Sequence, residues 1–271
     1  MTDHFPSLRS PRIADGQIGA AAEQLWDAQR DRAPIAPITI AYPELDVADA
    51  YAIQRVNMHR RLAAGAKLVG HKIGLTSKPM QTLLGVDEPD FGFILDDMVV
   101  QTGSIAVESF CAPRVEPEVA FLLHAPLRGP HIGPADVRAA TEAVAVALEV
   151  VDSRIADWKL TLPDTVADNA SSGAVVLGDW IPYTEALNLP EAVATLELGG
   201  ELIDTGKGSA VLGDPAVAVA WLANALADYG TGLEAGQVVM SGSFTSAAFV
   251  HTCDTARATI SGLGAVSLSF T

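Results

Sequence analysis

The N-terminal part of the chain carries apolar residues at the three- and four-residue spacing of an amphipathic helix. Residues 16–32 form the first such segment, and residues 46–64 form the second, with Asp46 as a candidate N-cap. Three prolines separate the two segments and predict an extended linker: Pro34, Pro37 and Pro43. We expect residues 1–66 to form an N-terminal helical cap.

After residue 66 the pattern becomes typical of strands. Alternating or continuously apolar runs predict strands at 68–75, 98–101, 115–123, 146–152, 173–178, 238–243, 255–261 and 265–270. Residues 195–204 predict a hairpin around Gly199 and Gly200. A short helix is expected from Ser77 to Gly85, and a longer one from Asp214 to Gly230.

These predicted elements indicate an α+β fold. The strands outnumber the helices and do not alternate regularly with them, which disfavours a doubly wound parallel sheet. We therefore expect residues 67–271 to form one mixed core with largely antiparallel pairing.

Composition narrows the class of protein. The chain of 271 residues has 33 acidic and 17 basic residues, a formal charge of −16, which argues against nucleic-acid binding. We find no uninterrupted apolar run long enough to span a bilayer and no signal pattern in the first ten residues, so we expect a cytoplasmic protein without membrane contact. The two cysteines, Cys111 and Cys253, make neither a disulfide framework nor a zinc cluster.

Two glutamates lie in an otherwise apolar predicted strand. Glu116 and Glu118 are two residues apart and therefore face the same side. Two ionised carboxylates about 6 Å apart repel by roughly 3 kcal/mol at an effective dielectric constant near 20. Arginine partners, a shared proton or a bound cation would each relieve this repulsion.

A third acid, Glu149, lies in a second apolar run and is not expected to face hydrocarbon. Three carboxylates on two adjacent strands would provide the oxygen ligands that Mg²⁺ or Mn²⁺ prefers. A solvated strand edge, or ion pairs to Arg114 and Arg154, explains the same residues without a metal. The spacing alone leaves both interpretations open.

Lys72 is the other charged residue within an apolar frame. It shares a strand face with Gly70 and Gly74, which leave space for a ligand beside it. Such a lysine holds a carboxylate or transfers a proton, or else it extends from a strand end to solvent. The adjacent His71 faces the other side, and we expect it to be packed and hydrogen-bonded.

Polar segments supply further candidates. Residues 86–92 have the composition of a loop, from which Asp90 can reach a pocket. In residues 164–173, Asp168 and Asn169 are typical turn formers, while Ser171 and Ser172 can donate to a substrate oxygen. Serines 241 and 243 suit contact with an anion but are equally ordinary at a strand end.

Six segments in order resemble one known family. They are Gly-His-Lys-Ile-Gly-Leu-Thr-Ser-Lys (70–78), Pro-Asp-Phe-Gly (89–92), Pro-Arg-Val-Glu-Pro-Glu-Val-Ala-Phe (113–121), Leu-Glu-Val-Val-Asp-Ser-Arg (148–154), Asp-Thr-Val-Ala-Asp-Asn-Ala-Ser (164–171) and Ser-Gly-Ser (241–243). Together they resemble the hydratase/decarboxylase branch of the fumarylacetoacetate hydrolase superfamily. Cys253 departs from the pattern, because a glycine is expected there.

The resemblance implies a β-roll-like core and a homo-oligomer. It also implies that Glu116, Glu118 and Glu149 bind Mg²⁺ or Mn²⁺, and that Lys72 and Asp90 are catalytic. Leu75, Ser171 and Ser243 are then expected near the substrate.

The activity that the resemblance implies is hydration of 2-hydroxypenta-2,4-dienoate (2-oxopent-4-enoate) in aromatic catabolism. Decarboxylation of 4-oxalocrotonate and hydration of 2-oxohept-4-enedioate are the alternatives. A complex with a related decarboxylase is expected too, and a non-catalytic role within it is a further alternative. No match to the histidine–glutamate lid pair of the carbon–carbon hydrolases is found.

Overall fold

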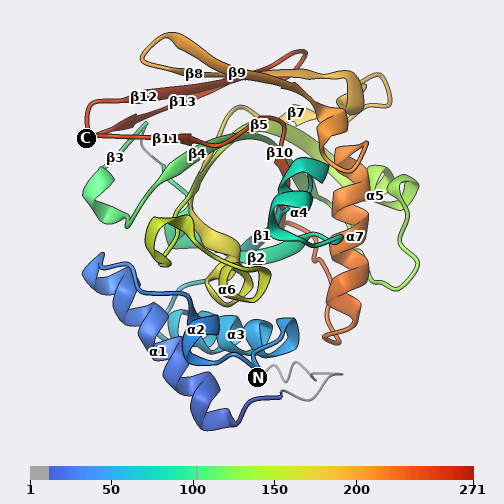
Figure 1. The fold of residues 1–271 in the computed structure, drawn as a ribbon. Coiled ribbons are helices and arrows are strands. Elements are labelled where there is room, and N and C mark those ends of the chain that lie inside the picture. The colour runs from blue at the N-terminus through green and yellow to red at the C-terminus, as the bar shows by residue number, and fades with distance from the viewer. Residues whose placement is uncertain (1–11, 102) are drawn as a thin grey trace.

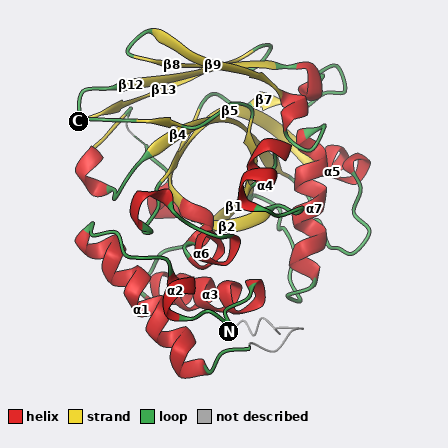
Figure 2. Cartoon of the chain, viewed as in Figure 1, coloured by secondary structure: helices red, strands yellow, loops and turns green. Residues whose placement is uncertain are grey.

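The computed structural model describes residues 12–101 and 103–271, and Figures 1 and 2 show its layers. N-terminal helices lie beneath a strongly curled sheet, and a second sheet lies on the opposite side of it. The first ten residues, on which the expected absence of a signal pattern rests, lie outside the described residues. The predicted α+β class is confirmed.

Three helices precede the first strand: α1 (Asp15–Asp31), α2 (Ile38–Ala41) and α3 (Val47–Ala63). Both long helices match the predicted segments. The Asp46 carboxylate accepts the backbone N–H of Asp49 at 3.0 Å, and the Asp49 carboxylate accepts that of Asp46 at 3.0 Å. This reciprocal cap fixes the start of α3. The short helix α2 interrupts the linker that we expected to be extended. The division of the chain at residue 66 stays a prediction.

The large sheet has the strand order β2-β1-β10-β4-β5-β6, with β11 paired to β4 and β7 to β5. Only β1 and β10 pair in parallel among these described strands. The strands are β1 (Leu68–Gly74), β2 (Asp90–Leu95), β4 (Arg114–Leu123), β5 (Thr141–Val151), β6 (Ser172–Leu177), β7 (Ile181–Pro182), β10 (Val238–Ser243) and β11 (Ala248–Phe249). A bridge between Val99 and Val175 brings the segment after β2 to β6, so the sheet curls back on itself.

The second sheet has the order β3-β13-β12-β8-β9. Its strands are β3 (Ser104–Ile105), β8 (Val193–Leu198), β9 (Glu201–Lys207), β12 (Thr255–Ile260) and β13 (Gly264–Phe270). The predicted hairpin is present, and Gly199 and Gly200 adopt φ angles of +59° and +87°, as a tight hairpin turn requires. Cys253 adopts a φ of +74°, which explains why a glycine is expected there.

Two sequence assignments were wrong, one at the start of β2 and one directly after it. Residues 90–92 belong to the buried strand β2 rather than to a loop, because pairing with β1 overrides their turn-like composition. Residues 96–98 form a 3₁₀ turn, and only Val99 of the expected strand 98–101 makes a bridge.

Short helices were also missed, since they are too brief to show a periodic pattern: α5 (Pro134–Ala140) and α6 (Leu162–Ala167). The expected helix after Ser77 is α4 (Lys78–Leu84).

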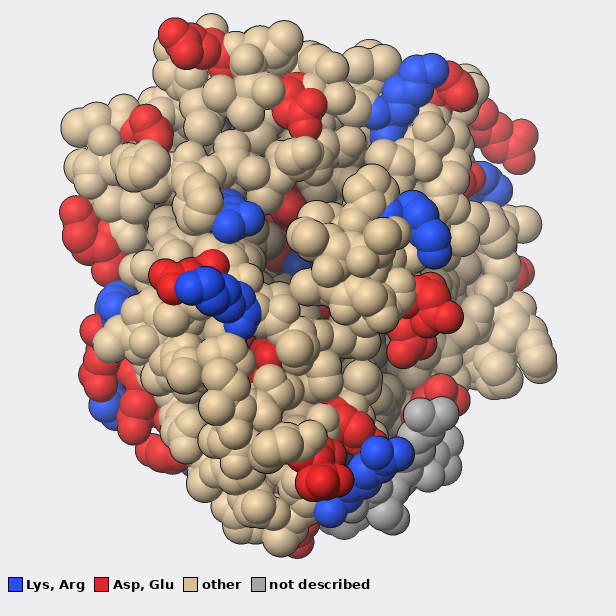
Figure 3. Space-filling view, in the orientation of Figure 1, with Lys and Arg blue, Asp and Glu red and all other residues tan. Residues whose placement is uncertain are grey.

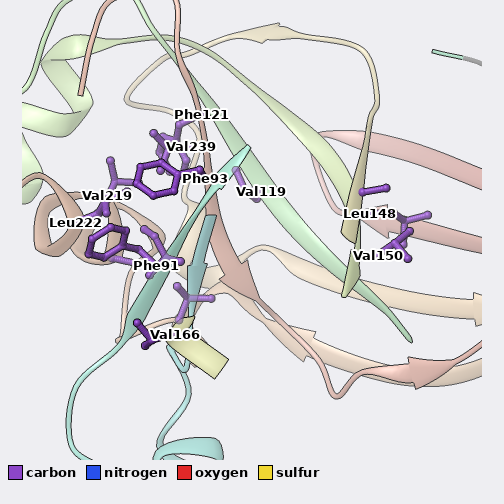
Figure 4. Close-up of a cluster of buried hydrophobic side chains, with 14 of the residues drawn as sticks. Phe91, Phe93, Val119, Phe121, Leu148, Val150, Val166, Val219, Leu222 and Val239 are labelled. Carbon is purple, nitrogen blue, oxygen red and sulfur yellow. The ribbon is translucent and has the colours of Figure 1, made fainter. Parts of the chain in front are cut away.

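Helix α7 (Pro215–Ala227) packs into the core. The Asp214 carboxylate caps it by accepting the backbone N–H of Ala216 at 2.9 Å. The segment Gly208–Ala227 is apolar and long enough to cross a membrane by length and composition, although Asp214 interrupts its apolar run, and half of it is buried. The α-helix itself spans 13 residues, about 20 Å, which is shorter than a bilayer core. Its residues Val219 and Leu222 pack beside Phe91 (Figure 4), as in a core helix.

The two faces of the curled sheet differ in character. The outer face contributes to the main hydrophobic core, which includes Phe121 and Val239. Across the inner face, Lys72 is in register with Met240, and Met240 with Ala120. A separate small apolar cluster that includes Met240 and Ala120 occupies part of this inner face. The polar residues described next lie on the same face.

Candidate active site

The three glutamates predicted as metal ligands come together on the inner face of the sheet. Glu116 lies directly opposite Glu149 in the register of β4 and β5, and Glu118 follows two residues later. One carboxylate oxygen from each lies within 4.8 Å of the others. Figure 3 shows a hollow in the surface of the molecule, with acidic and basic side chains at its base. Glu118 and Glu149 are buried, with 1% and 0% exposure.

Burial makes these carboxylates hard to ionise without a counter-charge. It raises the pKa of Glu116 to about 7, with a further contribution from Glu149. Burial and the neighbouring glutamates raise the pKa of Glu118 well above its ordinary value, although the backbone N–H of Gly242 donates to it at 2.8 Å. Neither carboxylate oxygen of Glu149 accepts a hydrogen bond from the described residues.

No arginine forms an ion pair with these acids in the described part of the chain, although the charge of Arg114 lowers the pKa of Glu116. The guanidinium of Arg114 stacks between Trp158 and Phe249, at 4.4 and 4.0 Å from the ring centroids. It forms no ion pair within the described part of the chain. Arg154 instead pairs with the buried Asp168. The arginine explanation left open by the sequence therefore fails for the described residues.

Lys72 is the cation that reaches the group. Its Nζ atom lies 3.4 Å from Glu149 Oε1 and donates to the carbonyl of Ala170 at 2.9 Å. Burial opposes the charge, but Glu149 and the other nearby acids raise the pKa of Lys72 above its ordinary value. The lysine is therefore charged at neutral pH, and it does not extend to solvent.

Asp90 lies beside Lys72 on the neighbouring strand, opposite Gly74. Its Oδ1 atom is buried and has no hydrogen-bond partner in the part of the chain that the structure describes. Burial raises the pKa of Asp90, and the charge of Lys72 partly offsets this. A Cβ atom on Gly74 would lie 2.2 Å from Asp90 Oδ1 and 3.3 Å from Lys72 Nζ. Glycine at this position leaves the space that both side chains occupy.

A left-handed turn holds the carbonyl that binds Lys72. Asn169, Ala170 and Ser171 all have positive φ angles, of 55°, 51° and 53°. The Asn169 side chain accepts the backbone N–H of Phe93 at 2.8 Å and donates to its carbonyl at 3.0 Å. Asn169 therefore does form side-chain-to-backbone bonds, but it forms them to another strand.

Arg154 stabilises the same turn through hydrogen bonds to the residues on either side of it. Its guanidinium bonds the carboxylate and carbonyl of Asp168 and, at 3.1 Å, the carbonyl of Ser172. The sequence offered Arg154 as a partner for the glutamates and did not suggest this role.

The predicted substrate contacts have mixed surroundings. Ser171 Oγ is buried and lies 3.2 Å from Thr165 Oγ1. Ser243 is in register with Glu118, but its hydroxyl donates to the carbonyl of Thr245 at 2.9 Å. Leu75 is half-buried at the end of β1, with a φ of +55°. The sequence did not favour Ser241 over Ser243, yet Ser241 Oγ is buried without a partner.

The donor set fits a divalent cation. All three candidate ligands are carboxylates, which Mg²⁺ and Mn²⁺ prefer. Among the described residues the oxygens of Glu149 accept no hydrogen bonds, and Lys72 interacts with four acids when Asp90 is counted. A bound cation would satisfy these oxygens and balance the charge.

Comparison with known proteins agrees with this arrangement. The profile described as Fumarylacetoacetate (FAA) hydrolase C-terminal matches residues 63–270. The chain belongs to the fumarylacetoacetate hydrolase family. The resemblance and the fold predicted from the sequence are thereby confirmed.

Within the fumarylacetoacetate hydrolase family, two hydratases are similar over most of their length. The 2-hydroxyhexa-2,4-dienoate hydratase of Comamonas testosteroni is 42% identical over 94% of this chain and 97% of its own. The 2-hydroxypent-2,4-dienoate hydratase of Pseudomonas putida is 45% identical over 79% of this chain and 97% of its own.

A decarboxylase has a similar structure. The 4-oxalocrotonate decarboxylase of Pseudomonas putida G7, complexed with magnesium and adipate, superposes with a TM-score of 0.93 and 36% identity, covering 97% of this chain and all of that one.

Proposed function

We propose that this protein is a divalent-metal-dependent hydratase of small 2-hydroxy-2,4-dienoic acids. The expected reaction converts 2-hydroxypenta-2,4-dienoate (2-oxopent-4-enoate) to 4-hydroxy-2-oxopentanoate. The observation that carries the proposal is the group of three glutamates beside Lys72, two of them buried and Glu116 half-buried, in a chain that is 42% identical to a dienoate hydratase over nearly its whole length.

Glu116, Glu118 and Glu149 are the proposed ligands of Mg²⁺ or Mn²⁺. The bound cation supplies positive charge that stabilises negative charge developing on the substrate's C2 oxygen. Lys72 is a fixed cation in this proposal, because the acids around it favour its charged form. It orients the substrate carboxylate by a charge-assisted hydrogen bond.

Asp90 is the proposed proton carrier. Burial raises its pKa, which favours uptake of a proton, and Oδ1 has no hydrogen-bond partner among the described residues. Leu75, Ser171 and Ser243 are proposed to contact the substrate. Ser171 belongs to the left-handed turn in which the carbonyl of Ala170 accepts a hydrogen bond from Lys72.

The proposed setting is the cytoplasm, with the chain in a homo-oligomer. The relatives are bacterial hydratases of small metabolites, which supports a small-molecule substrate. A complex with a related decarboxylase and a helical cap over residues 1–66 are further parts of the proposal.

Turnover of the purified metal-loaded protein tests this function. Loss of the conjugated dienoate is followed by ultraviolet absorbance, and the product is identified by mass. We expect a product heavier than the substrate by one water, and no turnover after exhaustive chelation. A dienoate that persists with fresh metal, or turnover that is complete in chelator, would contradict the proposal.

Decarboxylation of 4-oxalocrotonate is the second candidate, because the structural match to that decarboxylase covers almost the entire chain. Both reactions need charge stabilisation at the same substrate oxygen, so the carboxylate group does not separate them. Carbon dioxide release from 4-oxalocrotonate, measured beside dienoate hydration with the same preparation, decides between them. The hydratase proposal requires the rate of dienoate hydration to exceed the rate of carbon dioxide release from 4-oxalocrotonate.

A further inference from the structure

A cavity of about 150 Å³ lies behind the candidate active site, between α3, the C-terminal end of α7 and β1–β2. Residues adjacent in a strand point to opposite faces. Lys72 and Asp90 face the glutamates, so the neighbouring His71 and Phe91 face this cavity, which both of them line. The cavity is therefore separate from the site described above.

Aromatic rings form the walls of this cavity. Phe91 stacks on Tyr51 with ring centroids 4.4 Å apart and an interplanar angle of 20°. Phe93 and Tyr229 approach Phe91 edge-on, at 6.3 and 6.0 Å. Phe91 and Phe93 project to the same side of β2 (Figure 4). Such walls favour a planar ligand that stacks or makes edge contacts.

Three side chains lining the cavity carry buried polar atoms that have no hydrogen-bond partner among residues 12–101 and 103–271: Gln54 Oε1, one terminal nitrogen of Arg55, and His71 Nδ1. His71 and Gln54 are each only 2% exposed. An unsatisfied buried polar group costs about 1–3 kcal/mol, so three around one cavity indicate that something binds there. The expected hydrogen bond of His71 is thus missing at Nδ1.

The charged side chains that line the cavity are Arg55 and Glu234, and Glu234 is paired with Arg128. Burial lowers the pKa of His71 to about 4, so this ring is neutral at pH 7. The guanidinium of Arg55 lies 5.4 Å from the Tyr229 ring centroid and keeps donors available. Arginine on an aromatic wall suits a carboxylate. A cavity of about 150 Å³ is large enough to hold one benzene-sized ring.

We propose that this cavity is a second ligand site that binds a small planar monocarboxylate, aromatic or conjugated, with its carboxylate on Arg55 and its ring between the aromatic walls. The proposal does not depend on the function assigned to the glutamate site.

Titration calorimetry of the metal-loaded protein with benzoate tests this site. We expect saturable binding of one benzoate per chain. Arg55→Met should weaken it at least tenfold, and Arg55→Lys should weaken it less because the charge remains. Arg60→Met is the matched control on the same helix, because Arg60 bonds Glu23 outside the cavity, and it should bind as the wild type does. Cyclohexanecarboxylate, which is not planar, should bind more weakly.

Benzoate is also a carboxylate that the glutamate–metal site can attract, so Lys72→Met separates the two sites. Binding that persists in Lys72→Met and falls in Arg55→Met supports the proposal. Binding that is lost in Lys72→Met but unchanged in Arg55→Met overturns it. So does the absence of saturation at millimolar benzoate, which would mean that water alone fills the cavity.

Discussion

Glu116 and Glu149 face each other across the β4–β5 pair, in direct register, with no arginine between them. Like charges directly opposite in a sheet destabilise it. Glu149 is fully buried and Glu116 half-buried, and Glu118 lies within 4.8 Å of both. The repulsion between the three carboxylates is relieved when they share a bound cation.

Metal binding should therefore stabilise the protein, and Glu118→Gln should remove most of that effect. A metal at 100 times its dissociation constant adds about 2.7 kcal/mol to the free energy of unfolding. We expect Mg²⁺ or Mn²⁺ to raise the Tm of the chelator-treated wild type by several degrees. Scanning calorimetry with and without metal measures the shift. The exposed Glu108→Gln is the control and should keep it; a full shift in Glu118→Gln would exclude Glu118 as a ligand.

Lys72→Met should lower kcat/KM by about 10–100-fold, because a hydrogen bond to a charged group contributes about 1.5–3 kcal/mol. The fold should persist, because the bound cation still balances the carboxylates. Steady-state kinetics and circular dichroism measure the two effects. Lys67→Met, at an exposed position just before β1, is the matched change and should retain activity. Equal rates in the two variants would rule out a catalytic Lys72.

Gly74→Ala should reduce kcat at least tenfold while leaving the protein folded. The new Cβ would lie 2.2 Å from Asp90 Oδ1, so the carboxyl group must move. Gly19→Ala, in α1 with open space around the added atom, is the control. It should raise the free energy of unfolding by about 0.5–1 kcal/mol. Unchanged kinetics in Gly74→Ala would mean that the position of Asp90 is not critical.

The sequence predicted the residues of this site better than their surroundings. Glu116, Glu118 and Glu149 were singled out because charges in apolar strands are costly wherever they lie, and the structure brings them together. The strand of Asp90 was missed, because turn-forming residues precede a strand whose stability comes from pairing with β1. The left-handed turn at Asn169 depends on contacts with Phe93 and Arg154, which no local pattern contains.

Arg154→Met should destabilise the protein by about 3–5 kcal/mol, because it leaves the buried Asp168 unpaired. It should also lower activity, since the turn that bonds Lys72 loses its support. Urea unfolding measures the first effect. Arg128→Met breaks an exposed pair with Glu234 and should cost less than about 1 kcal/mol. A similar small loss in Arg154→Met would show that the turn holds without this arginine.

His71 should make stability depend on pH. Its pKa is about 4 in the folded protein, below the ordinary 6.5, because burial disfavours the charged ring. Between these values the unfolded chain binds a proton that the native protein excludes, so acidification favours unfolding. We expect the free energy of unfolding to lose about 2 kcal/mol from this residue between pH 7 and 4.5.

Urea titrations of the wild type and His71→Phe at both pH values isolate the contribution of His71, since the buried acids titrate in both proteins. The wild type should lose more stability on acidification than the variant. Identical losses would place a proton on His71 in the native state.

The alternation of Lys72 and His71 along β1 limits how this chain can change in length. Deleting or inserting one residue of the strand before His71 would exchange their faces. The imidazole would then point toward the carboxylates, and the ammonium group would point into the cavity with aromatic walls. Length variation among relatives should therefore be concentrated in exposed connections such as the Gly199-Gly200 turn, while the spacing from Gly70 to Gly74 stays invariant.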